Sequence, residues 1–432
     1  AVLFGVLVLC LVLRVPIGIS LGLSSLATIF CSGVVQPTYM AQTLVTGCDS
    51  FPLMAVPFFI LAGELMATGG ISRRLLNIAD AFLGRKYGGL AHVTIVACMF
   101  FAAISGSGPA TVAALGIILI PAMINRGGFS APFASSLMAS ASSIAIVIPP
   151  SIAFVVYASI TGVSVGDMFM GGWIPGIMMG LSLVIIIMIE CRKKGIQASK
   201  AKSSWGQRWK SFREAFWGFL MPVIIIGGIY GGVFTPTEAA AVSVVYGLVV
   251  GVFIYREVKM KDMIDILVDS GKTTGGIMLI IGAATLFSYV CTVFGIAQAA
   301  QALLLEISGN KYIFLLIVNV IFLIAGCFVD ANSAMYIFIP IMYPVAQQLG
   351  INLVHFGVLS TVNLAIGQVT PPVGVNLFVA IGVADKLQGL KDKTKVTIAS
   401  MSKAVWPMIL ACVISLLIVT YVPFFSTVFL KG

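Results

Sequence analysis

Two short polar breaks interrupt long apolar stretches of this chain, and they resemble copies of one design. The first is the Ser-Gly-Ser-Gly-Pro segment at 105–109, and the second is the Asp-Ala-Asn-Ser segment at 330–333. Each break is followed by an Ile-Pro-x-Met segment and then by a double proline, at 149–150 and at 371–372. Non-helical backbone is tolerated in a membrane only where protein or water satisfies its hydrogen bonds. Two such breaks at corresponding places in two halves therefore predict the binding site of a transporter.

The composition places these breaks in a membrane protein. Of the 432 residues, 59% are hydrophobic and 9% are charged, whereas a soluble domain carries about 25% charged residues. A spanning helix needs roughly 20 apolar residues, so the chain has room for about a dozen membrane segments. The sequence therefore predicts an all-α polytopic membrane protein surrounded by a lipid bilayer.

Basic residues mark the division between the two halves. Eight of the 25 lysines and arginines fall between Arg192 and Arg213, and such clusters are typical of cytoplasmic loops. This placement accounts for the formal net charge of +10 without a nucleic-acid partner. We expect residues 191–215 to form a cytoplasmic linker. Residues 1–190 would then hold the first scaffold segments and the first transport repeat, and residues 216–432 the second set.

Segment lengths and periodicity predict hairpins and surface helices as well as spans. The apolar pieces beside the first break, 89–104 and 110–124, are short for full spans. They fit a hairpin that enters and leaves the membrane on one side. Residues 71–83 repeat their apolar positions with a helical period, which predicts an amphipathic helix at the membrane surface. The charged stretch 256–271 is expected to match it in the second half. Residues 235–238 have the pattern of a helix capping box.

Enzymatic groups are missing from the sequence. His92 and His355 are the only histidines, and neither lies in a known catalytic spacing. The segment 106–108 is not a nucleophile elbow, because Ser105 stands where that motif requires glycine. It is not a phosphate loop either, because no Gly-Lys-Ser/Thr follows. We therefore expect no enzyme activity, and any uphill transport must use an ion gradient or a partner.

The two breaks offer oxygen ligands. Unwound backbone exposes carbonyl groups, and Ser105, Ser107, Ser333 and Thr370 add hydroxyls. Such oxygens hold Na⁺ and other hard cations. We expect each hairpin tip to face the broken helix at its double proline, and the half-helix N-termini to favour a carboxylate substrate. The alternative is that both breaks are proline kinks without a ligand.

Three charged residues within or beside apolar segments leave alternatives open. Asp330 is the only charged residue between Lys311 and Asp385. It is interpreted as an ion ligand, a substrate gate or a hydrogen-bonded tip, because an unpaired carboxylate at membrane depth is costly. The alternative is a loop aspartate in solvent. Arg14 could contact an anionic substrate or partner, or extend to lipid headgroups. Glu64, at the end of an apolar run, is expected to line a helix contact.

Several motifs of this chain resemble one transporter family. Segments 100–114, 148–151, 234–241 and 369–376 are similar to the large membrane subunit of tripartite ATP-independent periplasmic (TRAP) transporters. The resemblance implies an elevator-type transporter with inverted repeats, two re-entrant hairpins and amphipathic arm helices. It also implies coupling to Na⁺ at two or more sites, a small four-helix membrane subunit, and a periplasmic substrate-binding protein. The location would be the bacterial inner membrane.

The resemblance also implies which residues form the sites. The first sodium site would use Ser105, Ser107, Ala145, Ile148 and Pro149. The second would use Gly326, Gly367, Thr370 and Val373. The substrate site between the tips would use Pro150, Ser151, Asp330, Asn332, Ser333 and Asn376.

The expected activity is sodium-coupled uptake of an organic acid. The family transports C4-dicarboxylates and sialic acids, and the overall likeness favours a sialic acid. Two alternatives remain: a carboxylate symporter that needs no binding protein, and a passive channel. If the charge of the second tip takes part in transport, Asp330→Asn should reduce uptake more than Ser107→Ala.

Overall fold

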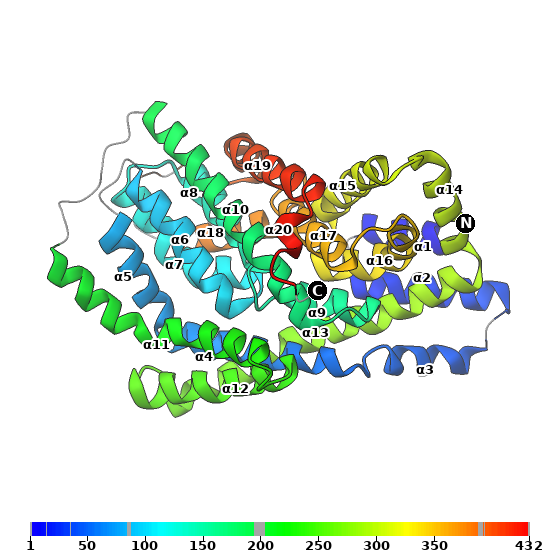
Figure 1. The fold of residues 1–432 in the computed structure, drawn as a ribbon, viewed down its shortest axis with the longest axis horizontal. Helices are drawn as coiled ribbons and strands as arrows, with labels where there is room; N and C mark the ends of the chain where they lie inside the picture. The colour runs from blue at the N-terminus through cyan, green and yellow to red at the C-terminus, as the bar shows by residue number, and fades with distance from the viewer. Residues whose placement is uncertain are drawn as a thin grey trace.

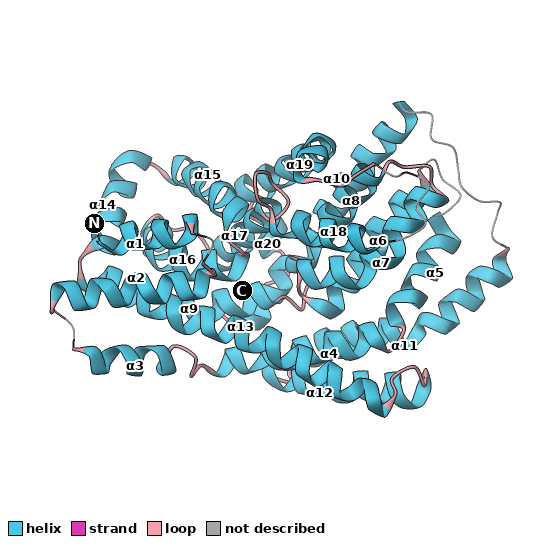
Figure 2. Cartoon of the chain, turned by 180° about the vertical axis from the view of Figure 1, so that it is seen from behind, coloured by secondary structure: helices cyan, strands magenta, loops and turns pink. Residues whose placement is uncertain are grey.

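The computed structural model describes residues 2–13, 15–34, 36–83, 88–193, 204–387, 392 and 394–430. Within these ranges every regular element is a helix and no strand occurs (Figures 1 and 2). Eight helical segments in the described part are long and apolar enough to cross a membrane. The prediction of an all-α polytopic membrane protein is therefore confirmed. Arg14 lies outside the described residues, so its predicted role stays a prediction.

Long helices from both halves form one layer of the molecule. α4 (Ala55–Thr68) packs against α12 (Pro236–Leu248) and α13 (Met260–Val293), and we call these three helices the long-helix layer. Figure 1 shows them along one long edge of the molecule. The elements around this layer are α1 (Val2–Val12), α2 (Ile17–Ser32), α3 (Pro37–Thr46), the 3₁₀ helix η1 (Phe51–Met54), α5 (Ile71–Leu83), α11 (Trp205–Tyr230) and the π-helix η3 (Val249–Ile254).

Each polar break lies between the two arms of a helical hairpin. The first hairpin consists of α6 (Gly89–Ser105) and α7 (Gly108–Asn125), and the second of α15 (Lys311–Phe328) and α16 (Ala331–Gln348). The arms of each hairpin pack against each other. The two hairpins lie towards opposite ends of the long axis in both views (Figures 1 and 2). The pairs of helices predicted at both breaks are therefore present.

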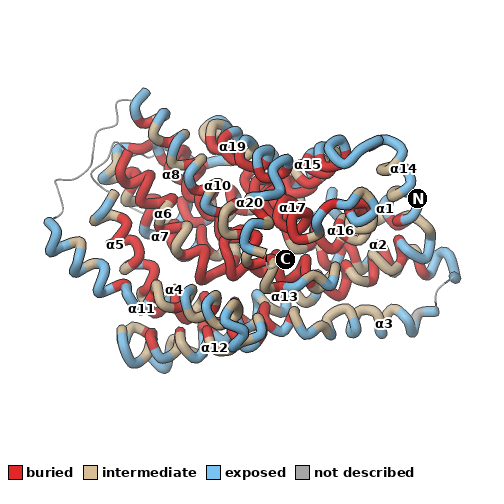
Figure 3. Tube along the Cα trace, viewed as in Figure 1, coloured by how far each residue is buried: buried red, intermediate tan, exposed pale blue. Residues whose placement is uncertain are grey.

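Two buried helices fill the space between the hairpins. Every residue of α8 (Ala131–Ser142) is buried, and so is every residue of α17 (Leu353–Gly367) after the first. Figure 3 shows this buried interior around α6, α7 and α17. Alanine, serine and glycine let helices approach closely, which is how helices associate in lipid. The remaining elements are the 3₁₀ helix η2 (Ser143–Ile146), α9 (Ile152–Thr161), α10 (Val165–Lys193), α14 (Ile296–Ser308), α18 (Val375–Lys386), α19 (Ile398–Tyr421) and α20 (Phe424–Thr427).

Two local predictions are confirmed and two boundaries are corrected. The helix predicted at 71–83 is α5, and the capping box is present, since the Thr235 hydroxyl accepts from the Glu238 N–H at 3.3 Å. The stretch 256–271 is not a separate amphipathic helix, because Met260–Val293 is one continuous helix of 34 residues. The predicted linker 191–215 is also shorter. α10 continues to Lys193 and α11 begins at Trp205, where Ser204 and Gln207 form a second capping box.

Candidate functional site

The first hairpin tip is a two-residue reversal between helices. Ser105 ends α6, Gly106 adopts a left-handed conformation with φ +59°, and Ser107 is the extended N-cap of α7. Glycine meets this requirement because it has no Cβ to clash in the left-handed region. The reversal aims the N-terminus of α7 and the serine oxygens of the tip at one place.

Hydroxyl groups at the first tip form a small network. The Ser105 and Thr111 hydroxyl oxygens lie 2.8 Å apart, and the Thr111 hydroxyl donates to the Ser107 carbonyl at 2.8 Å. Thr111 was missed by the sequence analysis, although its place one turn after Ser107 in α7 could have indicated it. The network holds the Ser105 hydroxyl and the Ser107 carbonyl close to each other. Oxygens of this kind fit a hard cation.

The first tip packs against the loop at the first double proline. A Cβ on Gly106 would lie 2.7 Å from the Pro150 carbonyl oxygen and 3.4 Å from the Ser151 Cα. Ala145 belongs to η2, whereas Ile148 and Pro149 lie in the irregular segment between η2 and α9. Ser151 caps α9, accepting from the Phe154 N–H, and its hydroxyl donates to the Ile146 carbonyl. The structure thus brings the tip and the broken helix together, as the sequence predicts.

The second hairpin makes a close contact through two glycines, one in each of the helices α15 and α17. A Cβ on Gly367 would lie 2.5 Å from the Gly326 Cα, so α15 and α17 touch backbone to backbone. The Gly374 N–H donates to the Cys327 carbonyl at 2.9 Å, which joins the second proline loop to the hairpin. The Thr370 hydroxyl donates to the Ile366 carbonyl at 2.8 Å, and Val373 is half-buried in the loop before Gly374.

Asp330 is a helix cap. Its Oδ2 accepts from the N–H groups of Asn332 at 3.1 Å and Ser333 at 3.2 Å. Its Oδ1 accepts from the Ser333 hydroxyl. Aspartate is among the preferred N-cap residues because its oxygens satisfy the free amides of the first turn. Of the alternatives left open by the sequence, this geometry describes the hydrogen-bonded tip.

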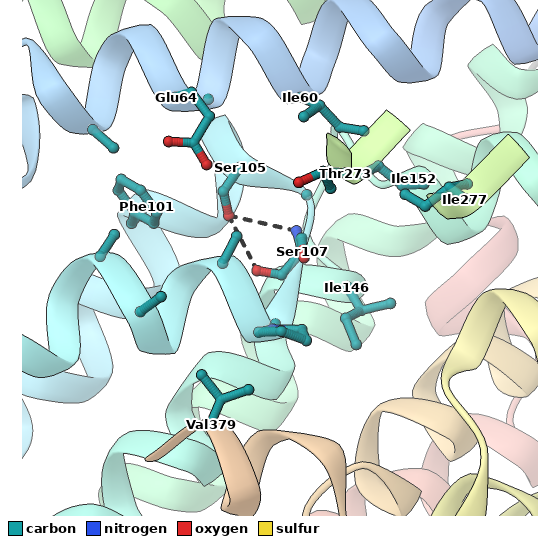
Figure 4. A pocket seen from close by; sticks show the side chains of 18 of the residues that line it. Ile60, Glu64, Phe101, Ser105, Ser107, Ile146, Ile152, Thr273, Ile277 and Val379 are labelled. Carbon is teal, nitrogen blue, oxygen red and sulfur yellow. Dashed lines mark hydrogen bonds between the residues drawn. The ribbon is translucent and has the colours of Figure 1, made fainter. Parts of the chain in front are cut away.

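A cavity of about 1030 Å³ lies between the two tips and the long-helix layer. The first tip contributes Ser105 and Ser107, and the second contributes Asp330 and Asn332. Figure 4 shows Ser105 and Ser107 beside this space, with Glu64 of α4 and Thr273 of α13 facing them. The other predicted site residues do not line the cavity. These are Ala145, Ile148, Pro149, Pro150, Ser151, Gly326, Ser333, Gly367, Thr370, Val373 and Asn376.

Three amide side chains beside the cavity have polar atoms without partners. Neither Nδ2 nor Oδ1 of fully buried Asn376 has a hydrogen-bond partner, and the same holds for Gln368 Oε1 and Asn332 Oδ1. A Cβ on Gly108 would lie 2.8 Å from Asn376 Nδ2 and 3.2 Å from Gln368 Oε1, so both amides adjoin the start of α7. An unpaired buried amide is costly, and a ligand at this place would relieve that cost. Gln368 is not among the residues predicted from the sequence, although it lies only two residues before the predicted ligand Thr370.

The cations that line the cavity already have acidic partners. Arg73 pairs with Glu257 at 2.8 Å, and Lys272 pairs with Asp269 at 3.1 Å. No other lysine or arginine among the described residues lines the cavity. Hydroxyls, carbonyls and amides therefore make up the polar groups at the tips, together with the capping carboxylate of Asp330.

Gly106→Ala should displace the first tip from the proline loop. Gly106 and Gly128 both have positive φ, at +59° and +69°, but only a Cβ at position 106 would meet other atoms within 4 Å. Both alanine variants lose about 1 kcal/mol of stability from backbone strain. Gly106→Ala should lose transport as well, because its Cβ would push against the Pro150 carbonyl.

Thermal unfolding of the purified variants and substrate uptake in proteoliposomes measure these two effects. Gly128→Ala is the control, since it carries the strain without the clash. If Gly106→Ala transports as well as Gly128→Ala, the contact between the tip and the proline loop is not needed for transport.

Comparison with known proteins places this architecture in a family. Residues 4–425 match the family described as "Tripartite ATP-independent periplasmic transporter, DctM component". The chain is 45% identical over 422 residues to the isethionate TRAP transporter permease protein DctMQ of Oleidesulfovibrio alaskensis, covering 98% of this chain and 65% of that protein. It is 40% identical over 439 residues to the C4-dicarboxylate TRAP transporter large permease protein DctM of Rhodobacter capsulatus, covering 98% and 97%.

The fold is similar to the crystal structure of the Alcanivorax borkumensis YdaH transporter. The TM-score is 0.59 at 14% identity, over 89% of this chain and 88% of that one. At this identity the likeness concerns the fold alone. The family match and the two relatives cover nearly all of this chain. The chain therefore belongs to the DctM component family of tripartite ATP-independent periplasmic transporters.

Proposed function

We propose that this protein carries an organic anion across the bacterial inner membrane in a step coupled to Na⁺. It would receive the anion from a periplasmic binding protein and work together with a small four-helix membrane subunit. One observation carries the proposal. Two hairpin tips and two broken helices meet beside a cavity, and the polar groups at the tips are hydroxyls, carbonyls, amides with unpaired atoms and the capping carboxylate of Asp330. Enzymatic catalysis has no support in this set of groups.

The charges around the cavity support coupling to a cation. The lysine and arginine that line it are paired with carboxylates. A buried anion without a compensating charge is costly. Ser105, Ser107 and the carbonyls of Ala145, Ile148 and Pro149 would hold one Na⁺, which supplies positive charge next to the anion. Gly326, Gly367, Thr370 and Val373 would hold a second through backbone carbonyls and the Thr370 hydroxyl.

The unpaired amides indicate where the anion would bind. Asn376 offers an N–H donor without a partner, and Asn376, Gln368 and Asn332 each have a side-chain carbonyl oxygen without a partner. The N-terminus of α7 starts at Gly108 next to two of them. Free amide groups at a helix N-terminus favour anions. Pro150, Ser151, Asp330 and Ser333 would shape the site from the adjoining loop and tip.

The substrate would be an organic acid of the kind named for the relatives. These names include isethionate and C4-dicarboxylates. The sialic acid predicted from overall likeness remains a candidate beside them. A cavity of about 1030 Å³ admits all three, so its size does not choose between them.

An elevator movement fits the contact between the first tip and α4. A Cβ on Gly63 would lie 3.5 Å from the Ser105 Cα, so the tip touches α4 at a position without a side chain. We propose that the hairpins move with α8, α9, α17 and α18 as a transport domain. The long-helix layer would be the scaffold on which this domain slides.

Removal of external Na⁺ should stop uptake by the complete complex. Proteoliposomes containing this protein, its small subunit and its binding protein would be supplied with radiolabelled succinate, isethionate or sialic acid. In Na⁺, the substrate concentration inside the vesicles should rise above the concentration outside. Uptake should fall to background when choline replaces Na⁺. Unchanged uptake in choline would contradict sodium coupling. An internal substrate concentration that never exceeds the external one would indicate a passive channel. Uptake without the binding protein would favour a stand-alone symporter.

Variants of Asp330 should separate its charge from its capping role. Asparagine also caps helices well, so Asp330→Asn removes the charge and retains an acceptor for the amides of the first turn. Asp330→Ala removes both. If the charge takes part in transport, Asp330→Asn should reduce Na⁺-driven uptake more than Ser107→Ala, at an unfolding temperature close to wild type.

Asp330→Ala is the reference for loss of the cap, since replacing an N-cap with alanine costs about 1 kcal/mol. Uptake that is normal in Asp330→Asn and reduced in Asp330→Ala would show that Asp330 acts only as a cap. Normal uptake in Asp330→Asn and in Ser107→Ala would remove these side chains from the proposed sites.

A further inference from the structure

Glu64 is an isolated carboxylate in an otherwise uncharged segment. Phe51–Thr68 is long and apolar enough to cross a membrane, and Glu64 is its only charged residue. An ionised group within such a segment is costly unless it is paired or hydrated, and such residues usually line an ion or substrate path. Glu64 therefore requires a reason beyond packing.

The structure places Glu64 opposite the first hairpin tip. Its neighbour Gly63 is buried against the tip, with a Cβ position 3.5 Å from the Ser105 Cα. Glu64 itself is half-buried and lines the same cavity as Ser105 and Ser107. Figure 4 shows its carboxylate on the side of the cavity that faces Ser105. The expected helix contact is thus made by Gly63, and the carboxylate extends into the cavity.

No group in the described part of the chain neutralises this carboxylate. Neither a hydrogen bond nor an ion pair joins Glu64 to another described residue. On α13, the nearby Lys272 is paired with Asp269 at 3.1 Å. At the rim, Arg73 is paired with Glu257 at 2.8 Å. Asp330, the carboxylate of the second tip, also lines the cavity. It accepts three hydrogen bonds as a helix cap.

We propose that Glu64 supplies the negative charge for the cation site of the first tip. Ser105 and Ser107 provide neutral oxygens on the hairpin, and Glu64 provides the charge from the long-helix layer. The charge acts on the site only while the tip lies against α4. The same carboxylate disfavours an anion beside the tip, so it favours departure of the substrate before the ion. This inference rests on the proposed sodium coupling.

The test uses Na⁺ alone as the probe and needs no substrate. The purified protein, with its small subunit, would be titrated with NaCl against choline chloride at constant ionic strength, and its thermal unfolding temperature recorded. A unit charge several ångströms from a cation, in partly hydrated surroundings, changes affinity by about fivefold or more. Glu64→Gln should therefore raise the half-saturating Na⁺ concentration about fivefold, while Glu64→Asp, which keeps the charge, should stay within about twofold of wild type.

Two further variants complete the design. Thr68 lies one helical turn after Glu64 and also lines the cavity, so Thr68→Glu should lower the half-saturating Na⁺ concentration even if Glu64→Gln fails to fold. Glu306→Gln, on the exposed side of α14, removes a carboxylate away from the cavity and should leave the Na⁺ response unchanged.

Two outcomes would overturn the inference alone. One is a wild-type Na⁺ response in Glu64→Gln, and the other is an equal shift in Glu64→Asp and Glu64→Gln. A wild-type protein without any Na⁺-dependent stabilisation would instead overturn the sodium coupling, and this inference with it.

Discussion

The rest of the structure depends on close backbone contacts beside the non-helical segments at the hairpin tips and the double prolines. In a membrane, such segments persist only where other parts of the protein satisfy them. Here each hairpin packs against the loop or helix next to a double proline, and glycines make both contacts possible. Gly106 faces the Pro150 carbonyl, while Gly326 and Gly367 touch each other. Because side chains are missing at these three places, carbonyl and hydroxyl oxygens from distant parts of the sequence come close together. The cavity and its candidate ligands follow from that approach.

The helices of this fold could be predicted from the sequence more fully than the side chains gathered at the candidate site. The paired breaks predicted the helix pairs of both hairpins, and helical periodicity predicted α5 with its observed bounds, Ile71–Leu83. Composition could not reveal that 260–293 form one helix, since a change from charged to apolar residues within a single helix looks like a boundary. Thr111 and Gln368 were missed for another reason. Their roles depend on side-chain direction and on unpaired atoms, which follow from packing across the chain and not from local spacing.

Charge is distributed unevenly over the cavity wall. The cations Arg73 and Lys272 are both occupied by acidic partners. The groups near the start of α7 are neutral amides with unused hydrogen-bonding atoms. A wall of this kind provides little positive charge of its own. On the proposed function, an organic anion at this place would be favoured only together with a cation, which would make co-transport obligatory.

The two tips differ in how they use their oxygens. At the second tip the Asp330 carboxylate is occupied by the first turn of α16, so its oxygens are already hydrogen-bonded. At the first tip, Ser107 caps α7 without a side-chain hydrogen bond to it, and the Glu64 carboxylate that faces this tip belongs to another helix, α4. In the proposed elevator movement, a negative charge built into the second hairpin would move with that hairpin. A charge on α4 would stay with the scaffold while the first tip moved away from it. Two sites formed from similar breaks would therefore change their cation affinity differently during one movement, because only the first depends on contact with α4.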